Sequence, residues 1–245
     1  MTTDWATRRP LGASCAVVTA TAVAYTGPGS AAVAPFRPRI FPRLSGYGDP
    51  GHVALTFDDG PDPAATPAVL SVLAEWNVHA TFFMLGSMAA AAPGLVGELA
   101  QAGHQVAVHG WVHRVAAADR ADVVYSDLAR ARDTVAGITG QAPAWFRPPY
   151  GILTSGALAA ARRLKLQPLL WTSCGREWKR GATPASVLAT VLRTLDGGGT
   201  VLLHDSDQQA RPGAARTARA ALPALLAECS RRALTVGTVA EHGLR

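Results

Sequence analysis

Short apolar runs alternate with longer helical patterns along most of this chain, and this alternation limits its fold more than any other feature. The runs with strand character cover residues 52–57, 80–84, 104–109, 145–147, 168–171, 200–204 and 234–236. The helical patterns cover residues 66–76, 88–102, 119–138, 155–164, 184–195 and 213–231. Such alternation predicts parallel strands joined by crossover helices. About seven repeats favour an α/β fold of the distorted (β/α) barrel type, with its active site at the C-terminal ends of the strands.

Polar side chains follow several of the expected strands at that end. The residues at these positions are Asp58, Asp59, His109, Arg147 and His204. Because the C-terminal ends of the strands share one face of a barrel, we expect these side chains to form a single site.

The string Thr56-Phe-Asp-Asp-Gly-Pro61 places two adjacent carboxylates where a strand ends in a turn. Neighbouring side chains diverge at such a point, so one acid can bind a cation while the other accepts a proton. Taken alone, an Asp-Asp-Gly string is also common in solvated turns.

The string His109-Gly-Trp-Val-His113 spaces two imidazoles by four residues. This spacing puts both rings on one face if the segment makes a helical turn. Two histidines and a carboxylate form a ligand set that zinc or another divalent metal accepts, with positions left open for water and substrate. The alternative interpretation is a pair of surface or core histidines.

Two further strings lie at expected strand ends. Phe146-Arg-Pro-Pro-Tyr-Gly151 is a rigid turn because its prolines fix φ. Its arginine could hold a carboxylate bidentately, and the N–H groups past the prolines could face an oxyanion. Leu202-Leu-His-Asp205 places a histidine at the end of a buried run, where a lone histidine is more often a core residue.

Together these strings resemble the polysaccharide deacetylase family, also called the NodB-homology domain or family 4 carbohydrate esterases. The resemblance covers residues 51–241, and the strings come in the family's order. The Asp-Asp and Arg-Pro-Pro strings match strongly, the Leu-Leu-His-Asp string matches well, and residues 234–239 look like the family's closing strand. The paired histidines match in spacing, but Gly110 stands where the family usually has Ser or Thr.

The resemblance implies a metal site and a base. By this likeness Asp59, His109 and His113 bind a divalent metal, for which zinc is the expectation. Asp58 is the general base, and Arg147 orients Asp58 and keeps it ionised.

The resemblance also implies the remaining catalytic and pocket groups. The backbone N–H of Tyr150 donates to the developing oxyanion, and His204 is the general acid that protonates the leaving amine. Trp178 and Leu202 line a pocket for the acetyl methyl group.

One departure from the family concerns the support of the acid. The family usually has Asp-x-x-Asp-Trp before the last string, and the first of these acids supports the histidine in our interpretation. Here the segment is Cys174-Gly-Arg-Glu-Trp178. If Cys174 takes that place, His204 loses its carboxylate partner and should have a lower pKa. Alternatively, Glu177 or Asp205 supplies the missing charge.

Three functions fit the sequence. The first is a hydrolytic N-deacetylase acting on peptidoglycan, chitin or a related glycan. The second is an O-acetyl esterase acting on xylan or another acetylated polymer, and the third is a non-catalytic glycan-binding relative. Retention of the base, the ligands and the acid argues against the third, because binding alone does not require such a set.

The first residues differ in character from the rest. Arg8 and Arg9 precede an apolar run at residues 11–25, and small residues follow. This pattern predicts a signal peptide over residues 1–34, a lead-in over 35–50 and a catalytic domain over 51–241. The alternatives for the first segment are a poorly ordered Ala-rich tail or an uncleaved anchor. We therefore expect a secreted or envelope-associated protein with no membrane span after cleavage.

Net charge and cysteine spacing limit the partners and metal sites that we expect. The net charge is +6, but no dense basic run interleaved with aromatic residues occurs, so nucleic-acid binding is not expected. We expect a monomer that acts on an acetylated polysaccharide. The chain has 3 cysteines without a Cys-x-x-Cys spacing, so a thiolate zinc site is not expected, while Cys174 and Cys229 could pair outside the cell.

Overall fold

The computed structural model describes residues 36–115 and 120–245. The expected signal peptide lies outside the described residues. The lead-in contains two short helices, α2 (Arg37–Ile40) and α3 (Pro42–Ser45), which the sequence analysis did not predict. Within the described ranges, no helix combines the length and the apolar character needed to cross a membrane.

The strands form one sheet in which every pairing is parallel. Their bounds are β1 (His52–Asp58), β2 (Thr81–Met84), β3 (Gln105–Val108), β4 (Trp145–Phe146), β5 (Gln167–Pro168), β6 (Ser173–Cys174), β7 (Thr200–His204) and β8 (Thr235–Gly237). The 8-stranded sheet has the order β5-β4-β3-β2-β1-β7-β6, and β8 pairs with β1. Every expected strand is present, and β6 is an addition.

The ends of this sheet are tied together by the chain itself. Strands β5 and β6 lie at opposite ends of the strand order, yet only residues 169–172 separate them in sequence. The sheet must therefore curl until its two ends approach each other. The expected distorted (β/α) barrel is confirmed.

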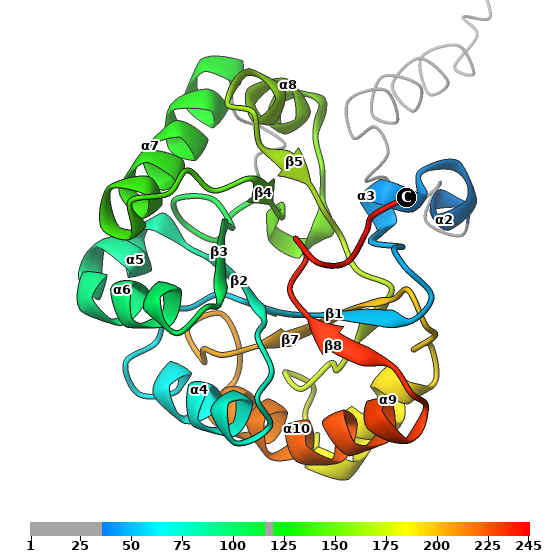
Figure 1. Ribbon diagram of the computed structural model, residues 1–245. Helices are drawn as coiled ribbons and strands as arrows, with labels where there is room; N and C mark the ends of the chain where they lie inside the picture. The colour runs from blue at the N-terminus through cyan, green and yellow to red at the C-terminus, as the bar shows by residue number, and fades with distance from the viewer. Residues whose placement is uncertain (1–35, 116–119) are drawn as a thin grey trace, which may run out of the picture.

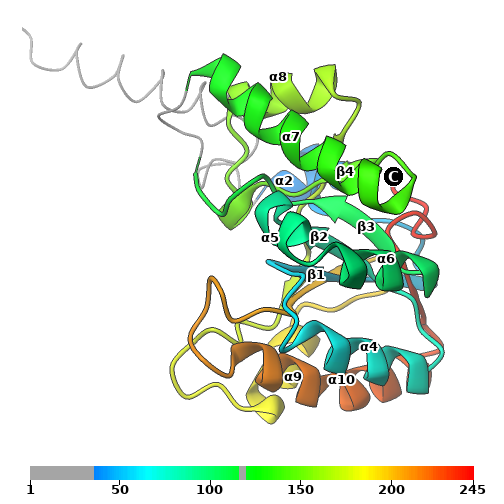
Figure 2. The same cartoon turned by 90° about the vertical axis from the view of Figure 1, so that its left-hand side faces the viewer.

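The helices cover the outside of this barrel in two groups (Figures 1 and 2). One group is α4 (Thr66–Glu75), α9 (Pro184–Leu192) and α10 (Ala214–Arg231). The other is α5 (Gly86–Ala91), α6 (Pro93–Gln101), α7 (Ala121–Thr139) and α8 (Ser155–Arg163). The single helix expected over 88–102 is wrong, because Pro93 begins a new helix after the non-helical Ala92.

The period of two along the strands decides which residues reach the active site. In β1, Val53, Leu55 and Phe57 join the core cluster that includes residues of α4, α9 and α10. Ala54 belongs instead to a separate cluster with residues of β2, β3 and β4. Since side chains alternate across a strand, Asp58 lies on the same inner face as Ala54.

The same alternation places the other expected residues. In β7, Val201 and Leu203 face the helices, so Leu202 and His204 point inward. Ala107 and Trp145 belong to the same cluster as Ala54, on the inner face of the sheet. His109 lies two positions after Ala107, and Arg147 lies two positions after Trp145, so both face inward as well.

Candidate active site

The two aspartates at the end of β1 diverge as the sequence predicts. Asp58 is the last residue of the strand and pairs in register with His204 of β7. Asp59 follows it with a φ of 77°, in the left-handed region. This turn of the backbone lets two buried neighbouring carboxylates, each 2% exposed, take separate partners.

Asp58 is paired with a fully buried arginine. Nη1 of Arg147 donates to Oδ1 of Asp58 at 2.6 Å and to Oγ1 of Thr56 at 2.8 Å. The rest of the guanidinium donates to the carbonyls of Leu169 and Leu170, in the segment that joins the two ends of the sheet. Arg147 therefore stabilises the closure of the barrel while it fixes the Asp58 carboxylate.

Asp59, His109 and His113 converge on one point. Oδ1 of Asp59 lies 3.5 Å from Nε2 of each histidine. The potential ligand atoms of the three residues all lie within 4.8 Å of one another. Among the described residues, this buried oxygen has no hydrogen-bond partner. An unpartnered buried carboxylate oxygen that faces two imidazole nitrogens fits a divalent cation.

The protonation of both histidines suits metal binding. Nδ1 of His109 donates to the carbonyl of Arg147 at 2.7 Å, which leaves the lone pair of its Nε2 toward Asp59. Burial lowers the pKa of His109 and of His113, so both rings are neutral near pH 7. Burial also raises the pKa of Asp59, and a bound cation would favour its ionised form.

The segment from His109 to His113 is not a helical turn, so that part of the prediction is wrong. Gly110 has a φ of 98°, and the segment forms an irregular bend. The two imidazoles still meet, with ring centroids 5.2 Å apart. Gly110 permits this backbone because it has no Cβ.

His204 has a carboxylate partner, and the partner is Glu177. Nδ1 of His204 lies 2.7 Å from Oε1 of Glu177, which is 1% exposed. Burial opposes the charged ring, but the hydrogen bond and the charge of Glu177, with those of Asp59 and Asp58, raise the pKa of His204 to about 9.

The expectation that Cys174 deprives His204 of support is therefore wrong. Cys174 lies on β6 opposite Leu202, and burial raises the pKa of its thiol to about 12. The alternative, in which Glu177 supplies the charge, is confirmed. Cys174 and Cys229 are both free thiols, so they do not pair.

An open pocket of about 250 Å³ joins these groups. Its lining includes every expected metal ligand together with Asp58, His204, Tyr150, Trp178 and Leu202. Tyr150 has a φ of 58° in the Pro-Pro turn, and its ring meets that of His113 edge-on at 4.3 Å. Trp178 meets His204 in the same way at 5.1 Å. All the predicted site residues except Arg147 therefore line a single pocket. Arg147 is fully buried, and its guanidinium binds the pocket residue Asp58.

Three further residues line the pocket: Trp171, which the sequence left open as a pocket wall or a core residue, and Gln209 and Ala210, which were not predicted. Trp171 stands at the end of the expected strand over 168–171, the same signal that identified Asp58 and His204. Gln209 and Ala210 lie in the loop before α10, where no pattern marks them. Such loop residues reach a site only through the tertiary fold.

These groups suit hydrolysis, because a cation site, an ion-paired carboxylate and a carboxylate-supported imidazole face one pocket at the end of a (β/α) barrel. Comparison with known proteins narrows this class. The family described as polysaccharide deacetylase matches residues 45–169, and the chain belongs to that family. The family and the fold expected from the sequence are confirmed.

Individual proteins with related sequences are polysaccharide deacetylases by name. The peptidoglycan-N-acetylglucosamine deacetylase PgdA of Listeria monocytogenes serotype 1/2a is 38% identical over 154 residues, which cover 62% of this chain and 32% of that protein. A chitooligosaccharide deacetylase of Sinorhizobium fredii is 39% identical over 168 residues, which cover 68% of this chain and 77% of that protein. The match thus spans only about a third of the Listeria protein but most of the Sinorhizobium one.

A solved structure supports the fold in detail. The Bc1960 peptidoglycan N-acetylglucosamine deacetylase superposes with a TM-score of 0.75 at 26% identity. The superposition covers 83% of this chain and 95% of that one.

Proposed function

We propose that residues 51–241 form a metal-dependent hydrolase that removes acetyl groups from an N-acetylated polysaccharide such as peptidoglycan or a chitin-like glycan. The observation that carries the proposal is the separation of three chemical roles around one pocket. The buried Arg147 holds the Asp58 carboxylate, and the buried Glu177 holds the His204 imidazole. Asp59, His109 and His113 form a separate group that could hold a cation. The names of the relatives support the choice of an N-acetylated glycan.

Asp59, His109 and His113 would hold the cation, for which we propose zinc because two imidazoles and one carboxylate are a common catalytic zinc set. When bound, the cation supplies a Lewis acid for the acetyl carbonyl.

Asp58 is the proposed general base. Its Oδ1 is occupied by Arg147 at 2.6 Å, and its Oδ2 lies 3.8 Å from Nε2 of His109, on the side of the pocket. The hydrogen bond from Arg147 fixes the Asp58 carboxylate at the pocket, where it can accept the proton of an attacking water.

His204 is the proposed general acid. Glu177 occupies its Nδ1, so Nε2 is the nitrogen that remains to donate, and it lies 3.9 Å from Oδ2 of Asp59. An amine leaves readily only after protonation, and a histidine with a raised pKa keeps that proton through neutral pH. The N–H of Tyr150, held in the Pro-Pro turn, is the proposed donor to the oxyanion.

Leu202 and Trp178 are the proposed walls for the acetyl methyl group. Leu202 is 2% exposed and Trp178 is 39% exposed, so one is buried beneath the pocket and the other stands at its rim. Apolar walls of this kind bind a methyl group while the polar groups act on the carbonyl.

Acetate release from a substrate panel tests the proposal. The panel contains peptidoglycan, chitooligosaccharides and acetylxylan, each with and without added zinc. We expect release from an N-acetylated substrate. Release from acetylxylan alone would favour the O-acetyl esterase, and binding without release would favour the non-catalytic relative.

We further propose that the chain is exported by its N-terminal segment, which lies outside the described residues. The expectation rests on Arg8, Arg9 and the apolar run over 11–25. Mature protein from a producing cell should begin between residues 25 and 35 by the signal-peptide pattern. N-terminal sequencing of cytosolic protein that finds Met1 or Thr2 would reject export.

A further inference from the structure

The segment that carries both candidate metal-binding histidines depends on neighbouring elements for its shape. The N–H of Gly86, at the start of α5, donates to the carbonyl of Gly110 at 2.8 Å. The N–H of Ser87 donates to the carbonyl of Trp111 at 3.0 Å. Helix α5 thus holds the carbonyl side of the bend.

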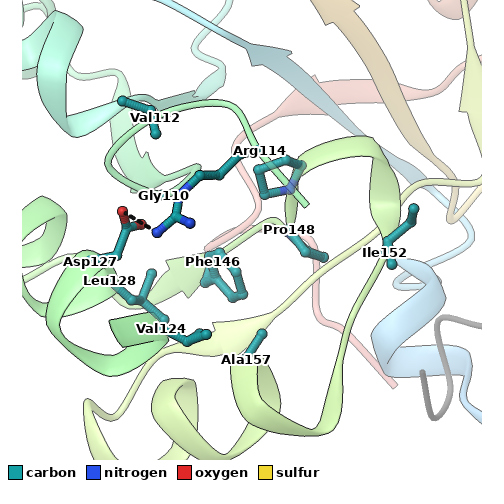
Figure 3. A pocket seen from close by; sticks show the side chains of 11 residues that line it. Gly110, Val112, Arg114, Val124, Asp127, Leu128, Phe146, Pro148, Ile152 and Ala157 are labelled. Atoms are coloured by element: carbon teal, nitrogen blue, oxygen red, sulfur yellow. Dashed lines mark hydrogen bonds and ion pairs between the residues drawn. The ribbon is translucent and has the colours of Figure 1, made fainter. Parts of the chain in front are cut away.

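A carboxylate of α7 holds the opposite side. Oδ2 of Asp127 accepts a hydrogen bond from the backbone N–H of Trp111 at 3.0 Å, and Oδ1 accepts one from Nη2 of Arg114 at 3.4 Å. These two donors flank His113 in sequence. Figure 3 shows Arg114 turned toward Asp127, with Gly110 beside the carboxylate.

The two histidines differ in their direct support. Nδ1 of His109 is fixed by the carbonyl of Arg147 at 2.7 Å. Nδ1 of His113 is buried and has no hydrogen-bond partner in the part of the chain that the structure describes. Gly110 has no side chain that could accept a hydrogen bond from Nδ1 of His113 or donate one to it. The orientation of His113 therefore depends on the backbone of its segment and on the ring of Tyr150.

We propose that Asp127 is a positioning residue for the metal site. Its carboxylate fixes the bend through Trp111 and Arg114, and the bend aims Nε2 of His113 at Asp59. The inference rests on the metal site of the proposed function. Asp127 lines none of the substrate pocket and acts through His113 alone.

Zinc affinity of the full chain, measured by competition with a chromophoric chelator, tests this role. Asp127→Leu keeps the size of the side chain but removes both acceptor oxygens. We expect it to weaken zinc binding by about 10- to 100-fold, the usual effect of losing a group that orients a ligand. Asp127→Asn keeps one acceptor oxygen for the N–H of Trp111 and should lose less.

Asp133 provides a matched control on the same helix. Within residues 36–115 and 120–245, its carboxylate is bound by Arg132 alone, and Asp133→Leu should leave zinc affinity unchanged. Thermal unfolding of the metal-free proteins separates the role from general stability. A folded Asp127→Leu protein that binds zinc as tightly as the wild type would overturn the proposal.

A double-mutant comparison gives a second, independent check. In a His113→Ala background, Asp127→Leu should have little further effect on zinc affinity, because Asp127 acts through the missing ring. An undiminished loss in that background would overturn the assignment. If the wild-type protein fails to bind zinc, the proposed metal site itself is wrong, and that result is distinct from either outcome above.

Discussion

Glu177 and His204 form a buried pair in which Oε1 of the carboxylate lies 2.7 Å from Nδ1 of the imidazole. The side chain of Glu177 is fully buried and that of His204 is 14% exposed. The pair leaves Nε2 of His204 on the side of Asp59, at 3.9 Å from its Oδ2. Support from Glu177 thus raises the pKa of the ring and leaves its other nitrogen free to act as the proposed general acid.

Replacing Glu177 should therefore change the pH profile of the enzyme. Glu177→Gln keeps an acceptor oxygen but removes the charge that favours imidazolium. Because a general acid works only while protonated, the alkaline limb of the rate profile should move to lower pH. The rate on an N-acetylated substrate should fall by about 10- to 100-fold, and the rate on an O-acetylated substrate should fall less.

Cys174→Asp is the control for this prediction. With Glu177 already bound to His204, a new carboxylate at Cys174 should move the alkaline limb little. A large upward shift with Cys174→Asp, together with an unchanged profile for Glu177→Gln, would show that the support of His204 is assigned to the wrong residue.

Asp58→Asn should separate the base from the metal ligands. The amide still fits beside Arg147 but cannot accept a proton. Turnover should fall by about 10²- to 10⁴-fold, the usual worth of a positioned base. Zinc affinity should change little, because the ligand atoms belong to Asp59, His109 and His113.

Asp59→Asn is the matched comparison, since the two residues are adjacent and equally buried. It should lose zinc as well as activity. If Asp58→Asn lost the metal and Asp59→Asn kept it, the roles of the two aspartates would be exchanged.

His104 should make the fold sensitive to acid. Its Nδ1 accepts a hydrogen bond from the N–H of Ala80 at 3.2 Å, and burial, with the nearby His79, lowers its pKa to about 4. In the unfolded chain the ring should titrate near pH 6.5, so the unfolded state binds more protons between about pH 6.5 and 4. The free energy of unfolding should therefore decrease as pH falls through this window, by at most about 3 kcal/mol from this residue.

Urea denaturation of the metal-free protein at several pH values measures this effect. His104→Asn keeps an acceptor oxygen for Ala80 but cannot titrate, so its stability should fall less between about pH 7 and pH 4. Parallel stability curves for the wild type and the variant would contradict a depressed pKa at His104.

The face that carries the candidate site could be predicted from the sequence because its determinants are local. Alternation along β1 and β7 decides that Asp58 and His204 point inward, and their register pairing then brings them together. The resemblance to a family assigns roles to these positions without any knowledge of distances.

The remaining features depend on tertiary contacts that no local pattern encodes. The bend at Gly110 follows from hydrogen bonds to α5 and α7, far from it in sequence. The choice of Glu177 over Cys174 depends on how the segment after β6 turns, with Arg176 at a φ of 56°. Strand β6 covers only Ser173–Cys174 and is too short to have a recognisable period.

The most direct test of the account is acetate release from an N-acetylated glycan by chelator-stripped protein, before and after stoichiometric zinc is returned. The account predicts no release from the stripped protein and recovery with zinc. His113→Ala should bind zinc too weakly to recover at a stoichiometric amount, because two remaining ligands hold a cation poorly. Full release by protein shown to contain no metal would contradict the assignment of Asp59, His109 and His113 as the centre of the active site.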